Sequence, residues 1–158
     1  MTVTEWSAPD PEGGPAPGVE FGSPGSRLVG YIVDQVVQFG LSIALLLAAG
    51  ILAVIFVPLG ALAFVAGIAF LFLYFPFFWV RSGQTPGMRL MGIKVVRDKD
   101  GGPIGWGSAF LRLIGYWISA LVFYIGFIWI FIDKRKRGWY DLMAGTCVIK
   151  VGGDLTSG

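Results

Sequence analysis

The stretch Arg27-Leu28-Val29-Gly30-Tyr31-Ile32-Val33-Asp34 opens a run of residues that is almost purely apolar as far as Val57. A carboxylate in an apolar helix is costly, by roughly 2.5–3.5 kcal/mol at the centre of a membrane-spanning helix on insertion scales. Arg27 and Asp34 are seven residues apart. On a helix they would share nearly the same face but lie about 10 Å apart along the axis. Each charge is therefore expected to find a partner elsewhere in the chain.

The composition is that of a membrane protein. Of 158 residues, 55% are hydrophobic and 14% are charged, and the mean hydropathy is +0.72. Soluble domains have about 45–50% apolar and about 25% charged residues. The length fits one small domain. The net charge of +2 is too small to indicate nucleic-acid binding.

The residues needed for most catalytic and metal sites are absent from the sequence. It contains a single cysteine, Cys147, and no histidine. No intramolecular disulfide, no histidine-based acid–base catalysis and no histidine-containing zinc site can form. The sequence also lacks a phosphate-binding GxxxxGK[ST] loop. We therefore expect a protein that is not an enzyme, with no catalytic residues, metal or cofactor.

Two hydrophobic segments follow a polar N-terminal arm. Residues 1–26 are dominated by proline and glycine, which predicts a disordered arm. Residues 27–57 and 59–80 are each long enough to cross a bilayer, which takes about 20 apolar residues. Ser26 would cap the first helix, and Pro58-Leu59-Gly60 would form the turn between the two.

Polar residues of the first segment recur at helical spacing and fall on about a third of its circumference. A polar stripe on a spanning helix faces protein or water, so it indicates either an interhelical hydrogen-bond seam or a transport path. Near the end of the second segment, Tyr74 and Trp79 fit an interfacial aromatic belt. The stripe consists of Arg27, Tyr31, Asp34, Gln35, Gln38 and Ser42.

The second half of the chain alternates polar and apolar segments. In the polar loop 81–106, Thr85 and Pro86 are typical of a helix start, and residues 93–97 read as a strand. Residues 107–132 form a third apolar segment, interrupted by Arg112. Residues 133–151 comprise a basic segment and a second strand, and 152–158 would be a flexible tail.

The sidedness of these segments indicates an even number of crossings between residues 107 and 132. A single crossing would put the two Lys/Arg-rich polar segments on opposite sides and separate the two short strands. Twenty-six residues are too few for two full spans of about 20 residues each. We therefore predict an all-α membrane protein with two transmembrane helices and a third segment forming a broken, re-entrant or hairpin helix. A small two-stranded cytoplasmic sheet would complete the fold.

Three ordered pieces of the chain resemble the RDD family of small bacterial membrane proteins. They are Arg27–Asp34, Gly83–Val96 and Asp141–Thr146, and the span from the first to the last covers most of residues 27–151. Arg27 and Asp34 match the arginine and first aspartate for which the family is named. Asp141 is our choice for the second aspartate, and Asp133 is the rival. The Pro/Gly-rich arm departs from the commoner layout and is similar to arms of actinobacterial members.

The resemblance implies a multi-pass protein of the bacterial inner membrane. The distribution of Lys and Arg discussed above predicts that both termini are cytoplasmic. The family has no single agreed activity. Transport of an unidentified ion or small ligand is one hypothesis, with Asp34 as the site. The alternative is a non-catalytic accessory or assembly subunit of a larger membrane complex, in which the charges are structural. We expect the protein to form a homo-oligomer or to be part of a larger complex, and we do not expect it to bind nucleic acid.

The charged residues form two candidate sites. Within a polar network we predict that Asp34 meets Arg112 and that Arg27 meets Asp141. The basic cluster is expected to orient the protein and to contact anionic lipids, each charge contributing about 1 kcal/mol. The network consists of Arg27, Asp34, Arg112, Asp133 and Asp141, and the basic cluster of Lys134, Arg135, Lys136 and Arg137.

Overall fold

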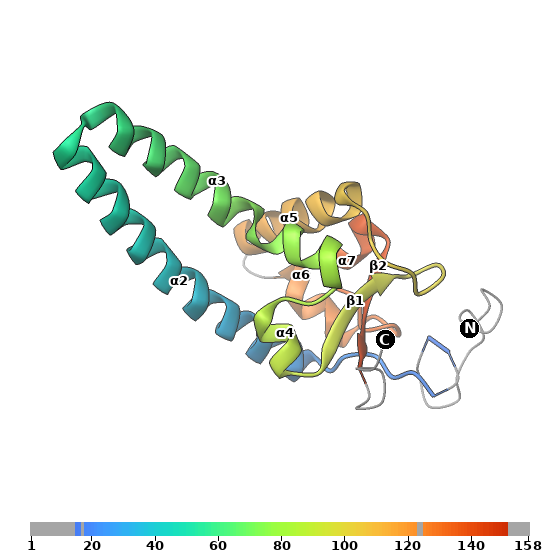
Figure 1. Cartoon of the computed structure of the whole chain (residues 1–158). Coiled ribbons are helices and arrows are strands. Elements are labelled where there is room, and N and C mark those ends of the chain that lie inside the picture. Colours follow the sequence, from blue (N-terminus) through green and yellow to red (C-terminus); the bar gives the residue numbers. More distant parts are fainter. Residues whose placement is uncertain (1–14, 17, 123–124, 152–158) are drawn as a thin grey trace.

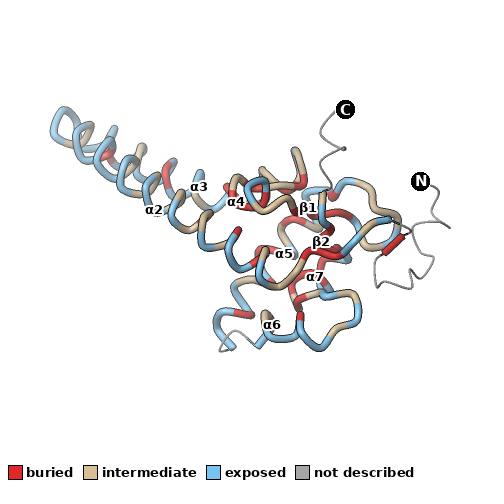
Figure 2. Tube along the Cα trace, turned by 90° about the horizontal axis from the view of Figure 1, so that it is seen from below, coloured by how far each residue is buried: buried red, intermediate tan, exposed pale blue. Residues whose placement is uncertain are grey.

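Two long helices form a hairpin that extends from a body of short helices and a two-stranded sheet (Figure 1). This architecture comes from a computed structural model, which describes residues 15–16, 18–122 and 125–151. The hairpin is mostly exposed, whereas the buried residues gather in the body (Figure 2). The predicted fold class of two long apolar helices, a broken third segment and a small sheet is confirmed.

The hairpin consists of α2 (Pro24–Ile55) and α3 (Val57–Ser82). Helix α2 begins before the expected cap at Ser26, because Ser23 accepts a hydrogen bond from the Ser26 amide and Pro24 suits the first helical turn. The connection is the single residue Phe56. Pro58 therefore lies in the first turn of α3 and not in a separate turn, as its fixed φ angle allows.

Both hairpin helices are apolar enough to cross a membrane, each with a mean hydropathy of 2.3 over its most apolar window. The third apolar segment is broken into α5 (Trp106–Leu121), α6 (Ile125–Ile128) and the 3₁₀ turn η1 (Trp129–Phe131). The direction of the chain changes by 111° between α5 and the α6–η1 pair. A single straight third span is thereby excluded.

The two predicted strands pair with each other. Strands β1 (Ile93–Arg97) and β2 (Thr146–Lys150) are antiparallel, with Ile93 opposite Lys150 and Arg97 opposite Thr146. The segments before and after the third apolar segment therefore lie side by side (Figure 1).

Part of the arm that we expected to be disordered is ordered along β2. The Gly22 amide donates to the Val148 carbonyl at 2.8 Å, and the Lys150 amide donates to the Glu20 carbonyl at 2.8 Å. Phe21 is only 4% exposed. These few residues carry no strand pattern long enough to recognise, and they are ordered by pairing with the sheet. Residues 1–14 and 17 of the arm and the expected flexible tail 152–158 lie outside the described residues.

A core forms where the short elements of the body meet the base of the hairpin. The body also contains α4 (Pro86–Leu90), which Thr85 caps as predicted, and α7 (Trp139–Ala144). Tyr74 and Trp79 are buried and do not form an interfacial belt. The core cluster consists of Trp79, Met88, Ile93, Val95, Ile104, Ala109, Leu113 and Val148.

A close approach of α2 and α4 gives the first prediction. A Cβ atom on Gly87 would overlap the carbonyl oxygen of Gly30. We expect Gly87→Ala to lower the free energy of unfolding by about 1–3 kcal/mol, because the backbone of α2 or α4 must shift. Gly40→Ala is the control, since a Cβ atom there meets nothing within 4 Å. Thermal unfolding in detergent measures both, and equal stability of the two variants would contradict the close contact.

Candidate functional site

The carboxylate of Asp141 is the centre of a buried charge network. Asp141 is 0% exposed and lies in the first turn of α7, where the Gly138 amide donates to its Oδ2 atom at 3.1 Å. Arg27 Nη1 donates to the same oxygen at 2.8 Å. Arg112 Nη1 and the Thr146 hydroxyl both donate to Oδ1. One carboxylate thus joins α2, α5, α7 and β2.

Arg27 connects the start of α2 to the sheet as well as to Asp141. Its Nε atom donates to the Gly22 carbonyl at 3.2 Å, and its Nη2 atom donates to the Val148 carbonyl at 3.4 Å. The predicted pairing of Arg27 with Asp141 is confirmed. A guanidinium group with several oriented donors suits this role, because it can satisfy a carboxylate and two carbonyls together.

Arg112 does not pair with Asp34, so this prediction is wrong. It forms an ion pair with Asp141 instead. Its guanidinium is 1% exposed, and Nη1 also donates to the Thr146 hydroxyl at 2.6 Å. The same group lies over the Trp79 ring, 4.7 Å from the centroid, and over the Tyr140 ring at 5.2 Å. Such cation–π contacts are favourable when desolvated. Arg112 is therefore held by one anion and a cage of aromatic rings.

Asp34 is bound by neutral donors. Its Oδ1 atom accepts from the Tyr74 hydroxyl at 3.2 Å and from the Gly87 amide at 2.9 Å, and its Oδ2 atom accepts from the Thr85 hydroxyl. The side chain is 2% exposed. Asp34 thus clamps α2 to α3 and to the start of α4. No charge pattern in the sequence could have revealed these donors.

The formal charges of the Asp141 network and of Asp34 add up to zero. Arg27, Arg112 and Asp141 together carry one net positive charge, and Asp34 carries one negative charge. Arg27, Arg112 and Asp34 line the same small cavity, whose volume is about 20 Å³. Opposite charges attract strongly where water is excluded. The arginine excess is thus compensated within the protein.

Asp133 belongs to a separate cluster and not to this network. It accepts hydrogen bonds from Arg137 Nε at 3.0 Å and from the backbone amides of Arg135 and Arg137. Arg135 and Arg137 also pair with Asp98 at the end of β1. Burial opposes ionisation of Asp133, but the hydrogen bonds from Arg137 outweigh it and lower the pKa of its carboxyl group. The cluster joins the two polar segments on either side of the third apolar segment.

These ion pairs reduce the number of basic residues that could contact anionic lipids. Arg135 and Arg137 are partly buried and engaged with aspartates. Lys134 and Lys136 are exposed. Contact with anionic lipids remains a prediction, and these two lysines are the members of the basic cluster best placed for it.

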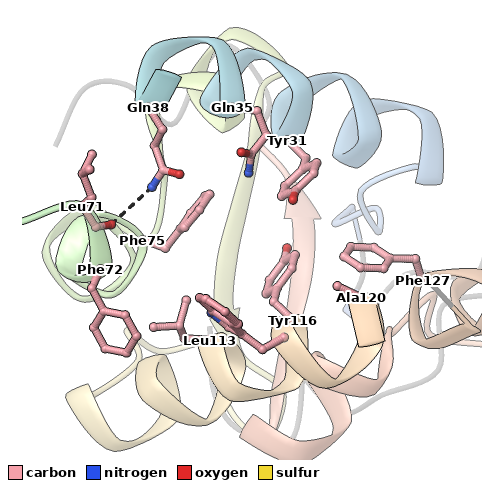
Figure 3. Close-up of a pocket in the computed structure, with 11 residues that line it drawn as sticks. Tyr31, Gln35, Gln38, Leu71, Phe72, Phe75, Leu113, Tyr116, Ala120 and Phe127 are labelled. Atoms are coloured by element: carbon pink, nitrogen blue, oxygen red, sulfur yellow. Dashed lines mark hydrogen bonds between the residues drawn. The ribbon is translucent and has the colours of Figure 1, made fainter. Parts of the chain in front are cut away.

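A larger cavity lies among α2, α3, α5 and α6 (Figure 3). Its volume is about 260 Å³, and none of the described residues that line it is charged. Gln38 donates to the Leu71 carbonyl at 3.4 Å across the cavity. Three residues of the polar stripe of α2, Tyr31, Gln35 and Gln38, line this cavity. The stripe alone did not predict that a cavity is there. The lining residues are Tyr31, Gln35, Gln38, Leu71, Phe72, Phe75, Leu113, Tyr116, Trp117, Ala120 and Phe127.

Potential metal ligands are not grouped together in the part of the chain that the structure describes. Within it, no group of three or more cysteine, aspartate or glutamate side chains could hold a metal ion. Cys147 is buried on β2, and burial raises the pKa of its thiol to about 12. A thiol with such a pKa is protonated at neutral pH and is a poor nucleophile.

The buried network yields a prediction about stability. Asp141→Asn should lower the free energy of unfolding by about 3–5 kcal/mol, because Arg27 and Arg112 would remain buried without their shared anion. Asp100→Asn is the control, since it removes a solvent-exposed pair with Arg97, which solvent screens. Denaturant unfolding in detergent compares the two. Similar small losses would show that Asp141 does not hold the fold together.

The Asp133 cluster yields a prediction about pH. A carboxylate whose pKa is lowered on folding stabilises the protein above its unfolded-state pKa, and this contribution is lost as the pH falls through the folded-state value. Wild type should therefore be more stable than Asp133→Asn above pH 3.8, with the difference shrinking at lower pH. Unfolding measured across this range tests it, and a difference independent of pH would contradict it.

Several bacterial proteins are similar in sequence to part of this chain. The "Proline-rich antigen homolog" of Mycobacterium tuberculosis is 28% identical over 85 residues, which are 53% of this chain and 35% of that protein. The "Uncharacterized protein YxaI" of Bacillus subtilis is 35% identical over 65 residues, which are 41% of this chain and 42% of that protein. The chain thus spans about a third of the length of the mycobacterial relative.

No solved structure matches the chain. The mycobacterial relative agrees with the expected likeness to actinobacterial members. The family model described as "RDD family" matches residues 21–145, which include Arg27, Asp34, Arg112 and Asp141. This match covers most of the chain, and the protein therefore belongs to the RDD family.

Proposed function

We propose that this protein is a multi-pass protein of the bacterial inner membrane that takes part in transport of a small ligand. The ligand would bind in the cavity among α2, α3, α5 and α6. The observation that carries the proposal is the cavity itself, whose volume is about 260 Å³ and whose apolar wall bears a few polar groups. This combination is typical of sites for small molecules.

The length of the hairpin supports a place for this cavity at the membrane boundary. A hydrocarbon layer of about 30 Å takes about 20 helical residues. Counted back from the hairpin tip at Phe56, this number reaches the level of Gln35 on α2 and Pro76 on α3. The buried charges and the sheet would then lie outside the hydrocarbon, and the cavity at its edge.

The sheet supports an even number of crossings between β1 and β2. Two paired strands must lie on the same side of a membrane, and the ion pair of Asp98 with Arg137 joins the same two segments. Gly22, before α2, pairs with β2 as well. The excess of basic residues in these segments favours the cytoplasmic side. The N-terminal arm and the C-terminal strand would both be cytoplasmic.

The bonding of Asp34 favours a structural role over an ion site. Three protein donors occupy its carboxylate, and they come from α3, Thr85 and α4. An ion would have to displace donors that hold the hairpin to the body. The amide of Gln35, one residue along the helix, faces the cavity and is open to a ligand (Figure 3).

A second candidate is the accessory or assembly subunit of a larger complex. The observation that favours it is the exposure of the outer hairpin, where large apolar side chains such as Leu46, Val54 and Leu62 lie on the surface. Lipid or the helices of a partner would cover them. Either a homo-oligomer or a different membrane protein meets this need.

Native mass spectrometry of the protein extracted from its own membrane tests both candidates. Wild type should carry a bound mass smaller than a phospholipid, and Ala120→Phe should lose it, because the new ring fills the cavity. Leu121→Phe is the matched control, since Leu121 is 79% exposed and does not line the cavity. A stoichiometric larger complex without the small mass would favour the accessory role. Absence of both the small bound mass and the larger complex would contradict both candidate functions.

A further inference from the structure

We infer that the ligand of this cavity is an uncharged amphiphile whose flat ring carries a carbonyl group, the chemistry of the quinones, with an apolar tail that lies along the hairpin. The inference rests on the proposed function and specifies its ligand. Four observations support it, and they concern charge, ring shape, hydrogen bonding and the path of the tail.

The first observation is that the cavity wall is neutral. All of its lining side chains are uncharged. The buried charged groups Arg27, Asp34 and Arg112 do not line this cavity, and each is already bound within the protein. An ion in the larger cavity would lose its hydration without gaining a counter-charge, which is strongly unfavourable. The wall thus selects a neutral molecule.

The second observation is a set of nearly parallel rings in the wall of the cavity. The planes of Tyr31 and Tyr116 differ by 12°, and those of Phe75 and Tyr116 by 9°. Aromatic groups prefer such offset parallel arrangements. A flat ring can extend this set. The volume of about 260 Å³ exceeds that of an engineered cavity of about 150 Å³ that binds benzene, so a bicyclic ring has room.

The third observation is a hydrogen-bonding group that no other described residue satisfies. Gln38 donates to the Leu71 carbonyl, but the Gln35 amide makes no hydrogen bond to another described side chain or carbonyl. Figure 3 shows this amide turned toward the middle of the cavity, with Tyr31 next to it and Tyr116 on the opposite wall. A purely apolar ligand would leave the amide N–H unpaired, whereas a ring carbonyl would accept from it.

The fourth observation is a second cavity that continues from the first toward the hairpin tip. Its volume is about 220 Å³, and it shares Leu71 with the first cavity. Its one polar side chain, Ser42, already donates to the Gln38 carbonyl. The other residues that line it are apolar or glycine, and they come from α2 and α3. An apolar tail would fit there while the ring stays at the membrane boundary.

Calorimetric titration of the protein in lipid nanodiscs, with empty nanodiscs as the blank, tests the ring carbonyl. The probes are menadione, a naphthoquinone without a tail, and 2-methylnaphthalene, which lacks the carbonyls. Wild type should bind menadione about fivefold to tenfold more tightly, as one hydrogen bond to a carbonyl allows. Gln35→Leu should remove this difference, and Gln35→Asn, which keeps an amide, should restore part of it. Unchanged unfolding temperatures of both variants would exclude a folding defect.

A second pair of measurements tests the tail. A naphthoquinone with a short isoprenoid tail should bind more tightly than menadione. Gly67→Leu, which fills the second cavity, should weaken the tailed probe and leave menadione unaffected, because Gly67 lines only that cavity. Loss of both probes in Gly67→Leu would contradict separate places for ring and tail.

Three outcomes would overturn the inference. Equal affinity of wild type for menadione and 2-methylnaphthalene, or an unchanged preference in Gln35→Leu, would show that no carbonyl is recognised. If neither ring binds but wild type still carries a small mass that Ala120→Phe loses, the ligand belongs to another class and the proposed function stands. If neither ring binds and no such mass is found, both proposals fail.

Discussion

The fold depends on one carboxylate, that of Asp141, held between Arg27 and Arg112. No element of the body is large enough to bury a core alone, since the sheet has two strands and α4 and α7 have five and six residues. Asp141 brings α2, α5, α7 and β2 to one point. A buried charge is costly unless its partners satisfy it fully. The group therefore stabilises only the complete arrangement, which specifies how these short elements assemble.

Asp34 provides a second, independent attachment of α2 to the body. Arg27 fixes the start of the helix to the sheet, and Asp34 fixes it to α3 and α4 about 10 Å further along the axis. Two attachments on one face leave the helix no freedom to rotate about its axis. The direction of the hairpin relative to the body follows from them. The larger cavity lies beside the second attachment, with Tyr31, Gln35 and Gln38 of α2 in its wall. The buried charges therefore position this wall without being part of it.

The sequence predicted the features that depend on local signals. Thr85 before Pro86 predicted the start of α4, and short β-branched runs predicted both strands. The Lys/Arg-rich segments on both sides of the third apolar segment predicted that the two strands lie on the same side of the membrane. The pairing of Arg27 with Asp141 followed from that topology. The partners of Asp34 did not, because a tyrosine hydroxyl, a threonine hydroxyl and a glycine amide leave no charge pattern. Asp133 was assigned to the wrong cluster, because the sequence could not show that Arg137 pairs with both Asp133 and Asp98.

The charged and the uncharged polar residues of α2 have different surroundings. Arg27 and Asp34 are bound on all sides by protein, so their chemistry is used to hold the fold. Gln35 faces the cavity, and the rings of Tyr31 and Tyr116 border both this cavity and the small charged one. An uncharged group can lie at a membrane boundary without a permanent partner at far less cost than an ion. For this reason our proposal places an uncharged residue of the stripe, Gln35, against the ligand.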